Sequence, residues 1–117
     1  MSLLKERVVY KPFEYPKAFD YYMKQQQAHW LWTEVPMAQD VTDWKTTLKD
    51  HEKNIVGGIL KGFAQTETVV NDYWTGLVTG WFRKPEVIAM ATTFGCFETI
   101  HAEAYSLLNE QLGLDNF

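Results

Sequence analysis

Residues 84–112 read KPEVIAMATTFGCFETIHAEAYSLLNEQL, and this stretch decides the fold. Pro85 stands in the expected first turn, where a missing backbone N–H costs nothing, and Gly113 is a suitable C-terminal stop. Apolar side chains recur at steps of three and four residues, which predicts a long amphipathic helix. Glu98 and His101 occupy the two positions that would complete its apolar stripe. The other members of the stripe are Val87, Ala91, Phe94, Tyr105, Leu108 and Leu112.

A second long helix is expected upstream, from about Asp50 to Trp81. Its apolar stripe contains Val56, Leu60, Phe63, Val70, Trp74, Leu77 and Trp81. The stripe has one gap, between Phe63 and Val70, and Glu67 occupies the position that would fill it. The connection at 82–84 is short, and short connections make neighbouring helices antiparallel. The two helices should therefore form an αα-hairpin.

The remaining chain precedes this hairpin. Residues 1–16 hold two of the four prolines and predict an extended arm. The pattern from Lys17 to about Ala28 predicts a short helix. Residues 29–42 show no helical period and are expected to be mostly loop, followed by a helical turn from Asp43 to Leu48 with Asp43 as its N-cap. The sequence thus predicts an all-α protein, a hairpin with an arm and a short helix packed alongside.

Composition excludes several classes of protein. A chain of 117 residues suffices for one small domain, and its net charge of -4 argues against nucleic-acid binding through phosphate contacts. It has no apolar run of about 18 residues, so no membrane span is expected. The single cysteine, Cys96, excludes an internal disulfide framework, and the start lacks a signal-peptide segment. We expect a cytoplasmic protein, and its 5 Trp, 6 Tyr and 7 Phe favour an oligomer or a fragment.

Three ionisable residues interrupt the two apolar stripes. Burial of an unpaired charge is costly, and no Lys or Arg lies on either stripe to pair with Glu67, Glu98 or His101. Glu98 and His101 are three residues apart and share one helix face. Glu67 precedes Trp81 by as many residues as Glu98 follows Lys84, so in a hairpin they lie at the same height. A shared divalent metal ion would neutralise all three; the alternative is a set of core polar groups that satisfy one another.

Carboxylate oxygen and imidazole nitrogen together suit iron, manganese or zinc. One Glu on one helix and Glu-x-x-His on the next is half of the ligand motif of ferritin-like dimetal carboxylate proteins. The complete site needs this motif twice, and the sequence holds one copy, because His29 and His51 follow Gln26 and Leu48 at the third preceding position. We therefore predict a single incomplete ferritin-like domain over residues 1–117.

Three segments resemble the small subunits of class I ribonucleotide reductases in sequence, order and spacing. They are HWLWTEVPMAQDVTDWK (29–45), FAQTETVVNDY (63–73) and FETIHAEAYSLLNEQ (97–111). The resemblance covers nearly the whole chain from about Gln25 onward and matches the N-terminal part of such subunits. It implies that Glu67 is a terminal carboxylate ligand, that Glu98 is a bridging carboxylate, and that His101 binds the same metal.

The same resemblance implies two redox residues. Tyr105, one helical turn after His101, matches the tyrosine that holds the stable radical. Trp30 matches the tryptophan that begins the radical relay to the catalytic subunit; its distance to Asp40 fits the family pattern, whereas Trp32 is two residues too close. From the residues alone, a core tyrosine and an ordinary buried tryptophan are the alternatives.

The implied activity is that of a ribonucleoside-diphosphate reductase, which makes deoxyribonucleotides for DNA replication. The implied cofactor is a dinuclear metal centre, with diiron favoured and manganese–iron or dimanganese as alternatives, because most of these subunits have Asp in place of Glu67. The implied partners are the large catalytic subunit, a second small subunit, and a further chain or remainder supplying the other Glu and Glu-x-x-His. Alternatives are a homodimeric ferritin-like metal-binding oxidase, a reductase-like ligand-binding oxidase, and a metal-free helical interaction fragment.

Overall fold

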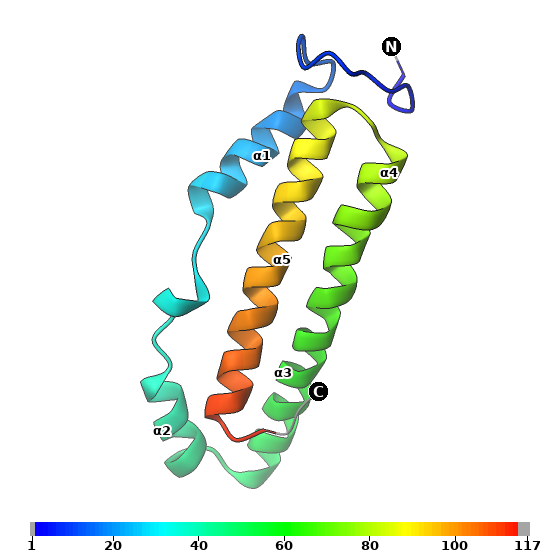
Figure 1. The fold of residues 1–117 in the computed structure, drawn as a ribbon. Coiled ribbons are helices and arrows are strands. Elements are labelled where there is room, and N and C mark those ends of the chain that lie inside the picture. The colour runs from blue at the N-terminus through cyan, green and yellow to red at the C-terminus, as the bar shows by residue number, and fades with distance from the viewer. Residues whose placement is uncertain (1, 115–117) are drawn as a thin grey trace. The chain divides into compact units, whose positions relative to one another are not determined.

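The computed structural model describes residues 2–114, which contain helices and turns and no β-strand. The elements are α1 (Pro16–Ala28), η1 (Trp32–Glu34), α2 (Ala38–Thr46), α3 (Asp50–Asp72), η2 (Tyr73–Val78), α4 (Thr79–Trp81) and α5 (Pro85–Gln111) (Figure 1). The all-α prediction is confirmed. The chain divides into a first unit, Met1–His29 with Val69–Thr99, and a second unit, Trp30–Thr68 with Ile100–Phe117. Within the described part of the chain, no helix has the length and apolar character needed to cross a bilayer.

The two long helices have their predicted bounds, with one change of type. Helical backbone runs without a break from Asp50 to Trp81, but the stretch Tyr73–Val78 is π-helical. The Thr75 hydroxyl donates to the carbonyl oxygen of Asn71 at 2.9 Å, so a side chain competes there for an α-helical acceptor. Apolar periodicity alone did not signal this change, and single-turn π segments are often found near functional sites.

The region between α1 and α3 is more helical than the sequence predicted. Both η1 and most of α2 fall within the expected loop, and α2 begins at Ala38. Asp43 is therefore inside the helix and is not its N-cap; its Oδ1 accepts a hydrogen bond from Nε2 of Gln39 at 3.0 Å. Met37 stands at the N-cap without a side-chain hydrogen bond and is buried. The start of α2 is therefore stabilised in two other ways. The side chain of Met37 is buried, and the carboxylate of Asp40 lies in the first turn, near the positive end of the helix dipole.

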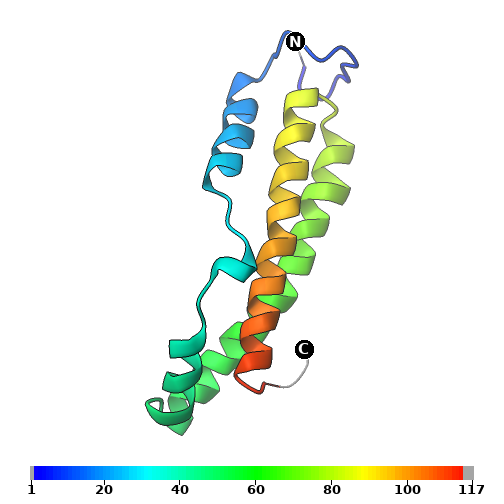
Figure 2. The same cartoon turned by 60° about the vertical axis from the view of Figure 1, so that its left-hand side comes forward.

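In the first unit, η2 and α4 pack antiparallel to the first part of α5, and α1 lies alongside the same part of α5 (Figures 1 and 2). Val78, Val87 and Ala91 form the buried core there, surrounded by Leu3, Ala18, Trp74, Phe82 and Met90. Gly95 allows close approach of the helices, because a Cβ at this position would clash with Cγ2 of Thr75. The Asn71 amide donates to the carbonyl oxygen of Gly95 at 2.6 Å.

A cluster of charged residues in the first unit fastens the N-terminal arm to the start of α5. Lys84 and Glu86 are both buried. The Arg7 guanidinium pairs with the carboxylate of Glu86, and Nζ of Lys84 lies 2.5 Å from Oε2 of Glu14. Oε1 of Glu86 also accepts the backbone N–H groups of Glu14 and Tyr15, at 3.0 and 3.1 Å. Tyr15 is the N-cap of α1 and makes no side-chain cap of its own, so Glu86 supplies the cap from another helix.

The same contacts shift the pKa values of two carboxyl groups, those of Glu14 and Glu86. The hydrogen bond from Lys84 lowers the pKa of Glu14. Burial acts to raise the pKa of Glu86, but hydrogen bonds from Arg7 and from backbone N–H groups outweigh it, so this pKa is also below its ordinary value. Both carboxyl groups are therefore charged near neutral pH, as their partners require.

In the second unit, α3 packs antiparallel to the last part of α5. Its buried apolar residues include Met37, Ala64 and Ala104. The end of α5 is a Schellman motif: the Leu114 N–H donates to the carbonyl oxygen of Asn109 at 2.9 Å, and Gly113, with φ of 73°, closes the turn. The predicted stop at Gly113 is confirmed.

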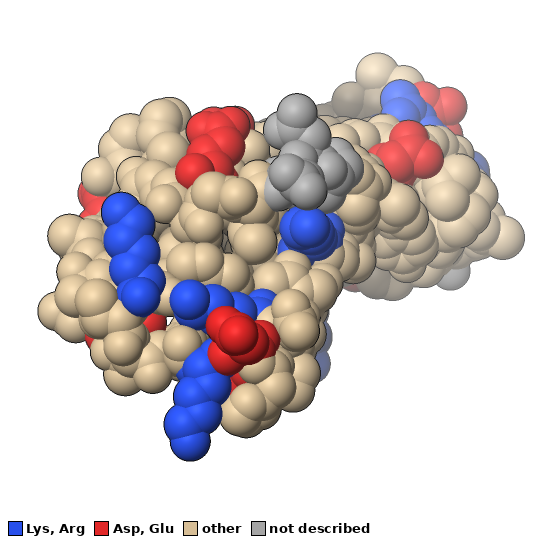
Figure 3. All heavy atoms as spheres, turned by 90° about the horizontal axis from the view of Figure 1, so that it is seen from below, with Lys and Arg blue, Asp and Glu red and all other residues tan. Residues whose placement is uncertain are grey.

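Much of the predicted apolar stripe on the first long helix is not buried in this chain. Phe63, Leu77 and Trp81 are 46%, 44% and 50% exposed, so the expectation that they form core is wrong for the described residues. Exposed apolar side chains in such numbers are typical of a surface that another protein segment covers. Figure 3 shows acidic and basic side chains interspersed with broad uncharged surface on one face.

Candidate metal centre

Glu67 and His101 meet in the second unit. Helix α3 carries Glu67 and helix α5 carries His101, and Oε2 of Glu67 lies 3.7 Å from Nδ1 of His101. The two side chains are 16% and 34% exposed. This separation exceeds a hydrogen bond between the two atoms, and it fits a metal ion bound by both, because metal–oxygen and metal–nitrogen bonds are each about 2.1 Å.

Glu98 belongs to the first unit, but it shares the unbroken helix α5 with His101 and precedes it by three residues. Residues three apart on an α-helix present their side chains on one face, with Cβ atoms about 5–6 Å apart. The side chain of Glu98 is half-buried. A carboxylate is thus available one turn from the imidazole, on the same side of α5.

Trp30 lies against His101 within the second unit. The two ring centroids are 5.3 Å apart and the ring planes are inclined by only 19°, so the rings are stacked. The indole is 37% exposed. This stack restrains the plane of the imidazole whose Nδ1 faces Glu67, and it covers one side of the ring from water.

Tyr105 is half-buried one turn beyond His101, on the same helix. Its ring centroid lies 5.4 Å from that of Phe63 on α3. Tyr105 also lines a cavity of about 260 Å³ within the second unit. The other residues of the cavity wall are Trp30, Val35, Met37, His101, Ala104 and Leu108. The phenol therefore shares a mostly apolar space with Trp30 and His101.

Two features of the structure were not predicted from the sequence. One is the charged cluster around Glu86 in the first unit, whose members are spread over the arm and α5 without any local motif. The other is His29, which the sequence marked only as a histidine without a carboxylate three residues before it. In the structure its ring stacks on Phe97, which directly precedes Glu98. The sequence signal that could have identified His29 is its position directly before Trp30.

The fold and the motif define a class: all-α proteins in which a Glu on one helix and Glu-x-x-His on the next provide carboxylate and imidazole groups for a metal. The family model described as "Ribonucleotide reductase, small chain" matches residues 7–117. The chain belongs to this family, and the predicted resemblance is confirmed.

Curated relatives agree with this assignment. The "probable ribonucleoside-diphosphate reductase small subunit" of Invertebrate iridescent virus 6 is 42% identical over 115 residues, which are 97% of this chain and 32% of that protein. Its counterpart in Invertebrate iridescent virus 3 is 36% identical, over 97% of this chain and 30% of that protein. The small subunit of Dictyostelium discoideum is 31% identical, over 91% of this chain and 31% of its own length. The chain spans about a third of the length of these relatives.

Proposed function

We propose that the chain is part of the small subunit of a ribonucleoside-diphosphate reductase, an oxidoreductase that makes deoxyribonucleotides, and that Glu67, Glu98 and His101 hold metal. The approach of Glu67 to His101, beside Glu98 on α5, carries this proposal in a chain of this family. Glutamate and imidazole suit a dinuclear iron centre, with manganese–iron and dimanganese centres as alternatives. Three ligands are half of such a site.

The proposal therefore requires partners. The second Glu and Glu-x-x-His come from a further chain or from the rest of the small subunit. The assembled small subunit pairs with a second copy and delivers an oxidising equivalent to the large catalytic subunit. A cytoplasmic location is part of the proposal, because deoxyribonucleotide synthesis uses soluble substrates there.

When bound, the metal centre would supply the oxidising power; the residues of this chain hold and protect it. The carboxylates of Glu67 and Glu98 offer anionic oxygens that offset the charge of the ions. His101 offers a neutral imidazole nitrogen, and the stack of Trp30 holds that ring in plane. The surrounding apolar side chains limit access of water to these groups.

We assign the stable radical to Tyr105. Oxidation of this residue would remove one electron and the phenolic proton; the metal centre that Glu67, Glu98 and His101 would hold supplies the oxidising equivalent when bound. The mostly apolar cavity and the ring of Phe63 separate the phenoxyl group from aqueous reductants. Trp30 is the proposed first station of the relay towards the large subunit, because its indole already contacts His101.

Elemental analysis of natively purified protein, combined with native mass spectrometry of its complexes, tests the metal assignment. We expect iron or manganese together with a partner that supplies the missing ligands. His101→Ala should lose most of the metal, whereas His51→Ala, an exposed histidine in α3, should keep it. A native preparation without transition metal would contradict the proposed function.

A second candidate function is a ferritin-like metal-binding oxidase built from two copies of this chain. Ile55, Ile59 and Phe63 on α3 are 62%, 50% and 46% exposed, and a second helical pair would cover such a face. Each copy would then contribute one Glu and one Glu-x-x-His. This candidate predicts a metal-loaded homodimer that needs neither a large subunit nor Trp30. The mass of the metal-containing species separates it from the reductase.

A further inference from the structure

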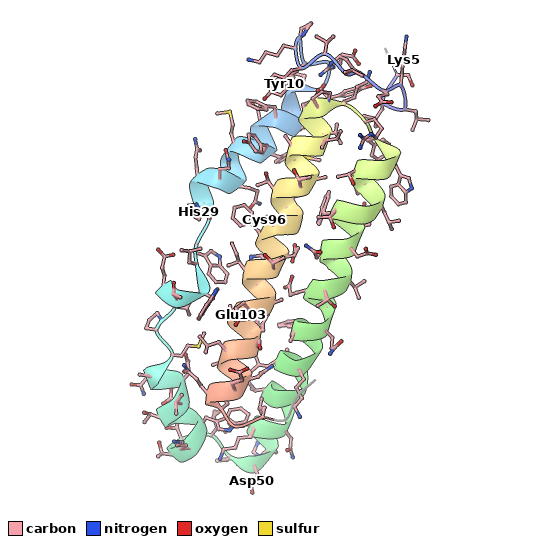
Figure 4. All side chains as sticks on the ribbon, viewed as in Figure 1. Lys5, Tyr10, His29, Asp50, Cys96 and Glu103 are labelled. Carbon is pink, nitrogen blue, oxygen red and sulfur yellow. The ribbon has the colours of Figure 1, made fainter. Side chains whose placement is uncertain are left out.

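His29 ends helix α1 with two contacts of its imidazole ring. It is the C-cap of the helix, and its Nδ1 lies 2.8 Å from the carbonyl oxygen of Gln26. A carbonyl oxygen only accepts hydrogen bonds, so Nδ1 carries the proton and satisfies one of the last helical carbonyls. The ring also stacks on Phe97 of α5, with centroids 6.2 Å apart and planes inclined by 24°. Both contacts lie within the first unit, and Figure 4 shows His29 at the end of α1.

The next residue makes a stack of its own in the second unit, where Trp30 lies on His101. Phe97 and His101 are four residues apart on α5; Phe97 precedes Glu98 in the sequence and His101 follows it. Two consecutive residues therefore each place a ring on α5, one turn apart along that helix. Each stack holds one of these two residues against α5.

The sequence of the segment that carries these rings would allow a second register, because tryptophan stands at both position 30 and position 32. His29 has φ of -66° and ψ of 152°, an extended conformation, and alternate side chains of an extended chain point to the same side. A slip of two residues would therefore bring Trp32 to the place of Trp30, with an identical indole. The same slip would bring Leu31 to the place of His29. A leucine can neither donate to the Gln26 carbonyl nor stack on Phe97, so His29 distinguishes the two registers.

We propose that His29 is a positioning residue that sets the register of the chain after α1, so that Trp30 and not Trp32 lies on His101. The structural part of this proposal stands on the two stacks and the cap. Its functional part rests on the proposed function, in which Trp30 starts the relay. In this role His29 acts through Trp30 and is not itself a metal ligand or a substrate-binding group.

The structural part is tested by ¹⁹F NMR of the full chain labelled with 5-fluorotryptophan. The Trp30 resonance is assigned by its loss in Trp30→Phe. We expect His29→Ala to shift and broaden this resonance, because the stack on His101 is no longer held. His51→Ala is the matched control and should leave it unchanged. An unchanged Trp30 resonance in His29→Ala overturns the proposal.

Two further variants keep the test decisive if His29→Ala disturbs all five tryptophans. His29→Phe keeps a ring against Phe97 and removes the Nδ1 donor, whereas His29→Gln keeps a donor and removes the stack. Each should move the Trp30 resonance less than full removal of the side chain. If neither variant moves it, the register role is overturned.

In the assembled holoenzyme, His29→Ala should lower nucleotide reduction about ten- to a hundredfold, the scale of a displacement of about 1 Å. Metal content and the yield of the Tyr105 radical should be retained. Loss of metal or radical would overturn the positioning role in favour of a general structural one. If Trp30→Phe instead retained full nucleotide-reductase activity, the relay role of Trp30 in the proposed function would be wrong. The NMR result would still decide whether His29 sets the register.

Discussion

The indole of Trp30 lies nearly parallel to the imidazole of His101, at 5.3 Å between ring centroids. If the relay starts here, Trp30→Phe removes the oxidisable indole and retains an aromatic ring for the stack. Nucleotide reduction by the holoenzyme should then be largely lost, because the relay has no oxidisable residue at its first position. Metal content should not change. The measurement is product formation beside elemental analysis of the same sample.

Trp32→Phe is the control for that experiment, because it alters an indole two residues away in η1. Its activity should stay close to that of the unaltered protein. Equal losses in both variants would show that the segment as a whole matters and would refute a specific role for Trp30.

Tyr105 provides the second prediction. Tyr105→Phe removes only the phenolic oxygen, so packing against Phe63 and the cavity wall should be preserved. The electron paramagnetic resonance signal of the tyrosyl radical should disappear, while metal binding remains. Tyr73→Phe, on a half-exposed tyrosine in η2, is the matched control and should retain the signal. Persistence of the same signal in Tyr105→Phe would assign the radical to another residue.

The sequence predicted the placement of Glu67 and His101 because only local helix geometry and one short turn are involved. Steps of three and four residues gave both helices, and equal distances from the turn placed their polar residues at one height. Trp30 was assigned only through a family resemblance, since residues 29–42 have no period from which a contact with His101 follows. The start of α2 was also predicted wrongly. Its N-cap is Met37, and a methionine is not a residue type from which a helix start can be predicted.

Long-range contacts were beyond such arguments. Arg7 and Glu86 are 79 positions apart, and no spacing rule connects an extended arm with the first turn of a distant helix. The exposure of Phe63 was missed for another reason. Periodicity shows which face of a helix is apolar, but it does not show whether this chain or a partner covers that face.

Gly95 gives a third prediction, on helix packing in the first unit. Gly95→Ala adds a methyl group that would clash with Cγ2 of Thr75 and lie close to the Asn71 amide. The free energy of unfolding should fall by about 1–3 kcal/mol, as is typical of overpacking. Gly80→Ala is the control, because a Cβ there meets nothing within 4 Å and gains helix propensity of up to about 1 kcal/mol. Urea unfolding of the two variants should therefore show opposite signs; a stabilised Gly95→Ala would contradict the close approach.

The fourth prediction concerns the buried carboxylate of Glu86. Glu86→Gln keeps the shape of the side chain but removes the buried carboxylate from the Arg7 guanidinium, which then has only the longer pair with Glu14 at 3.6 Å, so we expect a loss of about 3 kcal/mol in the free energy of unfolding. Glu6→Gln is the control, because the pair of Glu6 with Arg83 is exposed and 4.0 Å long and should contribute little. Proteolysis of the arm should accelerate in the first variant alone. Equal stability of both variants would show that the cluster does not fasten the arm.

The fifth prediction is the pH dependence that follows from the same cluster. The pKa values of Glu14 and Glu86 are below their ordinary value of 4.5 in the folded chain. Between the folded and the ordinary pKa, the unfolded chain binds more protons, so stability rises with pH in this window. The contribution is complete above the ordinary value and is lost as the pH falls through the folded values. Urea unfolding between about pH 3 and pH 7 should show this slope, and Glu86→Gln, which cannot ionise at that position, should show a shallower one. An identical slope in both proteins would mean that other carboxyl groups cause the acid sensitivity.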